Sequence, residues 1–213
     1  MKTISKLAYL LLASLLWMSC DPDEPEPEED GEVITNVILT FTPQGETTAS
    51  KVTAEAEDAD GAGAGSLEVL DTISLVANTQ YILTIELENR LEDPTESVTE
   101  EIEEEADSHQ FFFSFGSEQF TNTTGTGNID SDGTVDYLDY DSDSLAVGLE
   151  TSWTTANANF SDGSFRVRLQ HLEDLKSATV TSSDGDTDID ITFFYTTSGA
   201  TISATKFTAV DKF

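Results

Sequence analysis

The residues best suited to metal chemistry are His109 and His171, the only histidines in the chain. Each lies at the end of a segment whose side chains alternate as in a strand, and acidic residues at 103–105 and Glu173 lie nearby in the sequence. Imidazole is the commonest transition-metal ligand, and carboxylates complete such sites. We therefore predict a shared Zn²⁺ ion or haem iron at the two histidines, provided that their rings lie within about 10 Å of each other. The alternative is that each is half-buried and bonded to a carboxylate.

Aspartates at every second position form another candidate site. The clearest case is "DYDSDS", in which Asp139, Asp141 and Asp143 can direct carboxylates at one point. Ca²⁺ binds six to eight oxygens at about 2.3–2.6 Å, although this loop does not match an EF-hand. The alternative is that these are turn residues, because an aspartate side chain accepts hydrogen bonds from nearby backbone amides.

Motifs for catalysis are missing from the sequence. It has no HExxH zinc motif, no G-x-S-x-G elbow and no phosphate-binding loop. We therefore predict a protein that is not an enzyme, and a hydrolase based on paired carboxylates is the least favoured function. Four aromatic residues could line a ligand patch or belong to the core: Tyr137, Tyr140, Trp153 and Tyr195.

The only cysteine, Cys20, follows an apolar run at residues 7–18. Lys2 and Lys6 precede this run, whose length suits a signal peptide, whereas a membrane-spanning helix needs roughly 20 residues. A lone cysteine after a small residue resembles the lipobox of bacterial lipoproteins. Residues 1–19 are then a signal peptide, and Cys20 is the mature N-terminus that carries the lipid, with palmitate among its acyl chains. The alternative is an ordinary secretory signal with an incidental cysteine.

The composition is strongly acidic, with 42 Asp and Glu against 9 Lys and Arg and a net charge of −33. Such a charge repels nucleic acid and anionic lipid head groups, so both are poor candidate partners, and we expect no binding of nucleic acid. The stretch "DPDEPEPEEDGE" (21–32) has too few apolar residues to fold and predicts an extended tether at 20–32. Acidic residues behind a lipidated cysteine resemble the export signal of surface lipoproteins in Bacteroidetes.

Alternation with a period of two dominates the remaining chain, which we predict to be a single domain at 33–213. The spacing predicts an all-β fold, an Ig-like antiparallel β-sandwich of seven to eight strands. One short acidic helix is expected at about 94–106, with Pro94 in its first turn and Val98 and Ile102 on its apolar side. The strands are expected at 32–42, 50–58, 79–89, 109–117, 147–155, 163–171, 186–195 and 200–210.

Three stretches together resemble a family of small lipoproteins from Flavobacteria and other Bacteroidetes. They are "ILTFTPQG" (38–45), "EEIEEEADSHQFFF" (100–113) and "VGLETSWTT" with the following residues to 193. The family is often labelled "type 1 periplasmic binding fold", which implies βα units around a parallel sheet. Its members carry histidines at the positions of His109 and His171. The resemblance implies a partner as well, a TonB-dependent outer-membrane transporter.

These features together predict a surface-exposed outer-membrane lipoprotein that binds a ligand or partner and assists TonB-dependent uptake of a metal or haem. The alternative is a structural or adhesive acidic module with Ca²⁺ in its aspartate-rich loops.

Overall fold

The computed structural model describes residues 32–59, 67–115, 120, 124–125, 127, 134–156 and 160–199. The predicted signal peptide, Cys20, the tether as far as Gly31 and the last predicted strand at 200–210 lie outside the described residues.

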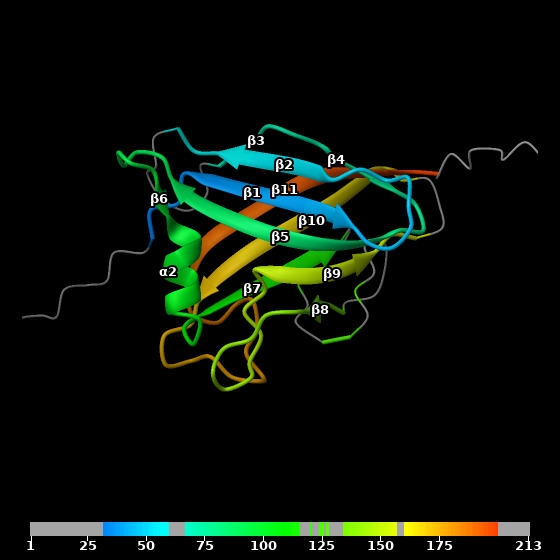
Figure 1. The fold of residues 1–213 in the computed structure, drawn as a ribbon. Helices are drawn as coiled ribbons and strands as arrows, with labels where there is room; N and C mark the ends of the chain where they lie inside the picture. The colour runs from blue at the N-terminus through cyan, green and yellow to red at the C-terminus, as the bar shows by residue number, and fades with distance from the viewer. Residues whose placement is uncertain are drawn as a thin grey trace, which may run out of the picture. The chain divides into compact units, whose positions relative to one another are not determined.

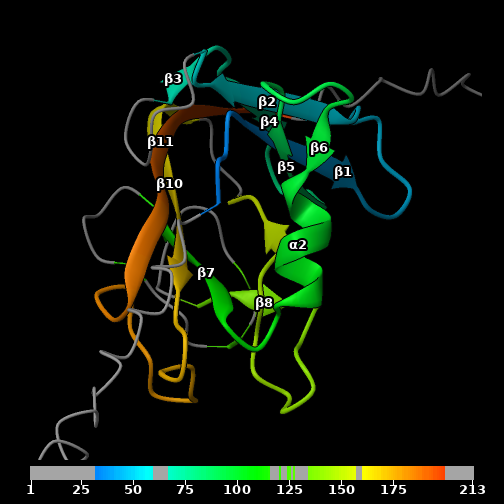
Figure 2. The same cartoon turned by 90° about the vertical axis from the view of Figure 1, so that its left-hand side faces the viewer.

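Two β-sheets pack face to face (Figures 1 and 2), which confirms the predicted all-β sandwich. The larger sheet has the strand order β3-β2-β1-β5-β9-β8, with β6 also paired to β5, and the smaller has the order β4-β11-β10-β7. The strands are β1 (Asn36–Pro43), β2 (Val52–Glu57), β3 (Glu68–Val69), β4 (Ile73–Val76), β5 (Gln80–Asn89), β6 (Glu96–Ser97), β7 (His109–Phe115), β8 (Asp136–Tyr137), β9 (Glu150–Thr154), β10 (Phe160–His171) and β11 (Asp186–Ser198).

The core lies between the sheets, where alternate residues of each strand point inward. Phe41 of the larger sheet meets Phe165 of the smaller one with ring centroids 6.0 Å apart, and Phe113 stacks on Phe165 at 5.8 Å. Tyr137, Trp153 and Tyr195 are also buried in this core, so of the four aromatic residues considered for a ligand patch only Tyr140 is exposed.

Four strands were not predicted, namely β3, β4, β6 and β8. Each has only two to four residues, which is too short for alternation to be recognised. One of them also changes the topology, because β4 pairs in parallel with β11. The other strand pairs among the described residues are antiparallel.

The helix is shorter than predicted and begins later. Helix α2 spans Val98–Glu104, and Ser97 caps it by accepting a hydrogen bond from the Glu100 amide. The predicted start at Pro94 is wrong because Glu96–Ser97 pairs with β5 as β6, which holds the chain extended up to the cap. The predicted apolar stripe of Val98 and Ile102 is buried.

The α/β fold implied by the family label is not the fold observed. A parallel sheet of βα units needs a helix after nearly every strand, and α2 is the only helix among the described residues. Among the described residues, no helix has the length and apolar character needed to cross a bilayer.

Candidate metal centre

His109 and His171 lie directly opposite each other in the smaller sheet. His109 is the first residue of β7 and His171 the last of β10, and the antiparallel register pairs their Cα atoms. Side chains at paired positions share one face of a sheet. The two imidazole centroids are accordingly 4.5 Å apart.

Two carboxylates join the histidines. Asp188 comes from β11, the other neighbour of β10, at an irregularity in the register next to Gln170. Glu32 is the first described residue and precedes β1. One ligand atom from each of Glu32, His109, His171 and Asp188 lies within 4.8 Å of the others. Four separate segments of the chain therefore converge on one point.

One hydrogen bond and one close contact with a carboxylate fix the orientation of the His109 ring. Its Nδ1 lies 3.1 Å from the carbonyl oxygen of Glu105, the residue that caps the C-terminus of α2. Its Nε2 lies 2.9 Å from Glu32 Oε1. With Nδ1–H donated to the backbone carbonyl, a metal ion that replaced the proton on Nε2 would find the Nε2 lone pair directed into the cluster. This arrangement is typical of metal-ligating histidines.

Two carboxylate oxygens of the cluster are buried without compensation. Glu32 Oε2 and Asp188 Oδ2 make no hydrogen bond within the described residues. A buried polar atom without a partner costs about 1–3 kcal/mol, and more when it is charged. A bound cation would remove this cost, so these two oxygens favour a metal ion independently of the distances.

Burial and the charges of the cluster shift the pKa values of Glu32, His109 and Asp188. Burial raises the pKa of Asp188 to about 7, and the negative charge of Glu32 adds to this effect. In the contacting pair, burial by itself would lower the pKa of His109 and raise that of Glu32. The hydrogen bond between the two side chains and their opposite charges outweigh burial, so the pKa of His109 is raised and that of Glu32 is lowered. A positive charge at this point therefore stabilises the ionised form of both carboxylates.

In the predicted calcium loop, the carboxylates of Asp139 and Asp141 bind other groups of the chain. Asp139 accepts hydrogen bonds from the amides of residues 148–150. Asp141 forms an ion pair with Lys176 at 2.9 Å and accepts from the amides of Asp143 and Leu145. Among the described residues, Asp139, Asp141 and Asp143 do not form a converging group like the one at His109. Only Asp141 makes the short-range amide contacts expected of a turn residue, because Asp139 accepts from amides nine to eleven residues away.

Both carboxylates of the cluster were missed in the sequence, where the residues at 103–105 and Glu173 were the predicted oxygen donors. Of these, Glu105 contributes its backbone carbonyl. The sequence contained one indication that Asp188 is functional. It lies inside the predicted strand "DTDIDITFF", where aspartate is disfavoured. For Glu32 there was none, since it continues an acidic run. Comparison of the chain with family models, curated proteins and solved structures gives no match in any of the three.

Proposed function

We propose that this chain is a cell-envelope lipoprotein whose β-sandwich binds a divalent transition-metal ion, Zn²⁺ above all, without catalysing a reaction. The observation that carries the proposal is the convergence of Glu32, His109, His171 and Asp188, with ligand atoms within 4.8 Å of one another.

The donor set fits zinc. Two imidazoles and two carboxylates are ligands that Zn²⁺ accepts in four-coordinate sites, with bonds of about 2.0–2.2 Å. Ligand atoms around such an ion are roughly 3.4 Å apart, so the most distant atoms of the cluster must approach one another by side-chain rotation. His171, Glu32 and Asp188 are only half-buried and can make that adjustment.

An ion suits the cluster better than haem. The His109 side chain is fully buried, and its ring lies against that of His171. A porphyrin needs an open face beside the axial imidazole, whereas a single ion needs only the space between the four ligand atoms. For this reason we propose metal capture or metal-dependent stabilisation, and not haem binding.

The cellular setting of the proposal rests on the N-terminal sequence. Cys20 at the end of an apolar run, followed by the acidic tether, supports lipidation and display on the outer membrane. A TonB-dependent transporter is the proposed partner because of the resemblance to Bacteroidetes surface lipoproteins. In this setting the module holds a metal ion at the cell surface, close to an uptake system.

Calorimetric titration of the metal-free, full-length protein with Zn²⁺ tests the proposal. We expect one site, and we expect His171→Gln or Asp188→Asn to weaken binding by at least about a hundredfold, since each removes a direct ligand. Both residues are half-buried, so these variants are expected to fold. Glu173→Gln is the control, because Glu173 is exposed and lies outside the cluster.

Zinc affinity that is unchanged in both ligand variants would rule out this site. Calcium binding that depends on Asp143 instead of His171 would favour the structural module with calcium in its loops.

A further inference from the structure

A hollow lies on the larger sheet beside β5, at the point where β5 is no longer paired with β9. Strand β9 pairs with β5 only at Gln80–Thr84. Beyond that point the Ile85 amide donates to the Leu149 carbonyl, and the Leu87 amide donates to Thr99 Oγ1 of α2. The start of β9 and the helix therefore diverge along β5, and they leave a hollow of about 340 Å³ between them.

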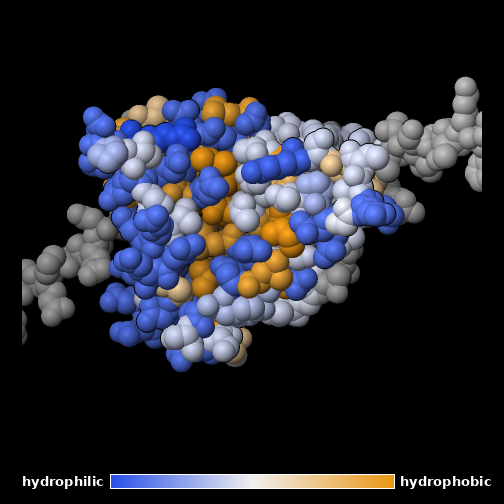
Figure 3. All heavy atoms as spheres, in the orientation of Figure 1, coloured by the Kyte–Doolittle hydropathy of each residue, from blue (hydrophilic) through white to orange (hydrophobic). Residues whose placement is uncertain are grey.

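The floor of the hollow is apolar. It is lined by Ile85, Ala106, Val147 and Leu149, and the exposed ring of Tyr140 stands at its side. Figure 3 shows apolar residues at the surface in this region, surrounded by hydrophilic ones. Cavities of about 300–1,000 Å³ with an apolar lining and a few polar groups are typical small-molecule sites.

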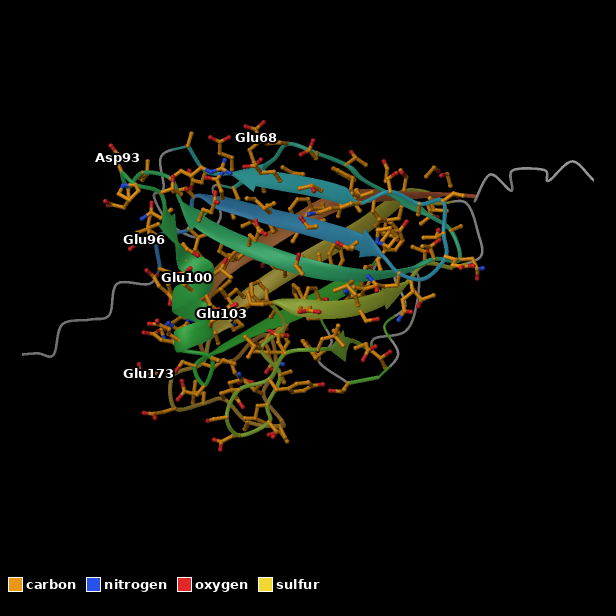
Figure 4. All side chains as sticks on the ribbon, viewed as in Figure 1. Glu68, Asp93, Glu96, Glu100, Glu103 and Glu173 are labelled. Carbon is orange, nitrogen blue, oxygen red and sulfur yellow. The ribbon has the colours of Figure 1, made fainter. Side chains whose placement is uncertain are left out.

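The rim of the hollow is acidic and carries no basic residue. Four carboxylates line it: Glu86, Glu103, Asp139 and Glu150. Asp139 is already satisfied by backbone amides. The other three side chains are exposed and make no hydrogen bond or ion pair within the described part of the chain. Figure 4 shows Glu103 on α2, and Glu150 opens β9 on the opposite side.

None of the five Lys and Arg residues in the described part of the chain lines the hollow, and four of them pair with carboxylates elsewhere. Arg90 pairs with Glu55 and Glu88, and Lys176 pairs with Asp141. Arg166 and Arg168 both pair with Asp190 on the smaller sheet. An apolar floor, an exposed aromatic ring and unpaired carboxylates are the groups that recognise an ammonium or guanidinium attached to an apolar body.

We propose that this hollow binds a small organic cation, with the apolar body on the floor and the charged head between Glu103 and Glu150. A hydrated inorganic cation fits less well, because it cannot use the apolar floor. The proposal is independent of the metal centre, which uses none of the residues that line the hollow.

Two matched probes test it, phenethylamine and phenethyl alcohol, which differ in the ammonium group alone. We follow the amide NMR shifts of the metal-free, full-length protein at about 0.15 M salt, where long-range fields are screened. The amine should bind at least about tenfold tighter than the alcohol and should shift the amides of Ala106, Val147 and Leu149. The double variant Glu103→Gln, Glu150→Gln should lose the preference for the amine and should bind the alcohol as tightly as the parent protein does.

Glu100→Gln, Glu173→Gln is the control, because it removes the same number of charges from exposed residues outside the hollow. This control should bind the amine as the parent protein does. An equal loss of amine affinity in both double variants would overturn the proposal, because it would show that the amine responds only to the overall negative charge of the protein. Equal affinity for the two probes, no saturable shift, or complete displacement of the amine by equimolar calcium chloride would overturn it as well.

Discussion

His109 and His171 are register partners across the β7–β10 ladder, and their ring centroids lie 4.5 Å apart. Because backbone hydrogen bonds of the sheet fix the pairing of the two Cα atoms, side-chain rotation alone can direct both imidazoles at one ion. Glu32 and Asp188 arrive from two other segments. An ion at this point would cross-link four parts of the domain.

Zinc should therefore raise the melting temperature. Free zinc at about a hundred times its dissociation constant adds about 2.7 kcal/mol to the free energy of unfolding. For a domain of this size that corresponds to about 5–10 °C, measurable by calorimetry. The double variant His171→Gln, Asp188→Asn should show no rise, and an equal rise in it would place the stabilising ion elsewhere.

Replacing Gly185 should disturb the metal centre through the backbone. Gly185 has φ +71°, and a Cβ there would lie 2.0 Å from the carbonyl oxygen of His171. Gly185→Ala should cost about 2–3 kcal/mol of unfolding free energy, from the left-handed conformation and the collision with backbone, and should weaken zinc binding. Urea unfolding and calorimetric titration measure the two effects.

Gly45→Ala is the matched control for this substitution. Gly45 has a similar φ of +76°, but a Cβ there meets nothing within 4 Å. It should therefore cost about 1–2 kcal/mol and leave zinc affinity unchanged. Equal costs for the two variants would show that the contact with His171 does not matter.

The ion pair between Lys176 and Asp141 should matter for stability because both side chains are almost fully buried, at 3% and 2% exposed. Asp141→Asn leaves the buried ammonium without its counter-charge and should cost about 3 kcal/mol at pH 7, measured by urea unfolding. Asp143→Asn is the control, since that side chain is exposed, and it should change stability by less than about 0.5 kcal/mol.

The cost of Asp141→Asn should depend on pH. Burial raises the pKa of Asp141, but the hydrogen bond and charge of Lys176, with the amide bonds, outweigh it and hold the pKa below its usual value. A lowered folded-state pKa gives stability that is present above the unfolded pKa and is lost as pH falls through the folded one. The difference between parent and variant should thus shrink below about pH 4. A constant difference down to pH 2 would contradict this coupling.

Lipid attachment at Cys20 is a prediction from sequence alone. Expressed in a bacterial host with radiolabelled palmitate, the protein should carry label and fractionate with membranes, because acyl chains contribute about 0.8 kcal/mol per buried CH₂. Cys20→Ser should lose the label. An unlabelled, soluble parent protein would remove the anchor from the proposed function and leave the metal centre untouched.

The longer strands could be predicted from sequence because each contains several apolar–polar alternations that only a half-buried strand explains. The strand β5, for example, buries Tyr81, Leu83, Ile85 and Leu87 in turn. The two-residue strands lacked this signal. The helix start was misjudged because Pro94 is a favourable local signal, whereas pairing of Glu96–Ser97 with β5 is a long-range contact.

For the site, the sequence by itself determined the two imidazoles and their places at strand ends. The tertiary structure alone decided that β7 and β10 are neighbours in a register that pairs His109 with His171, and that Glu32 and Asp188 complete the cluster. The physical reason is that alternation is a local property of the chain, whereas strand order and register depend on which apolar faces pack together. Residues far apart in sequence meet only through that packing.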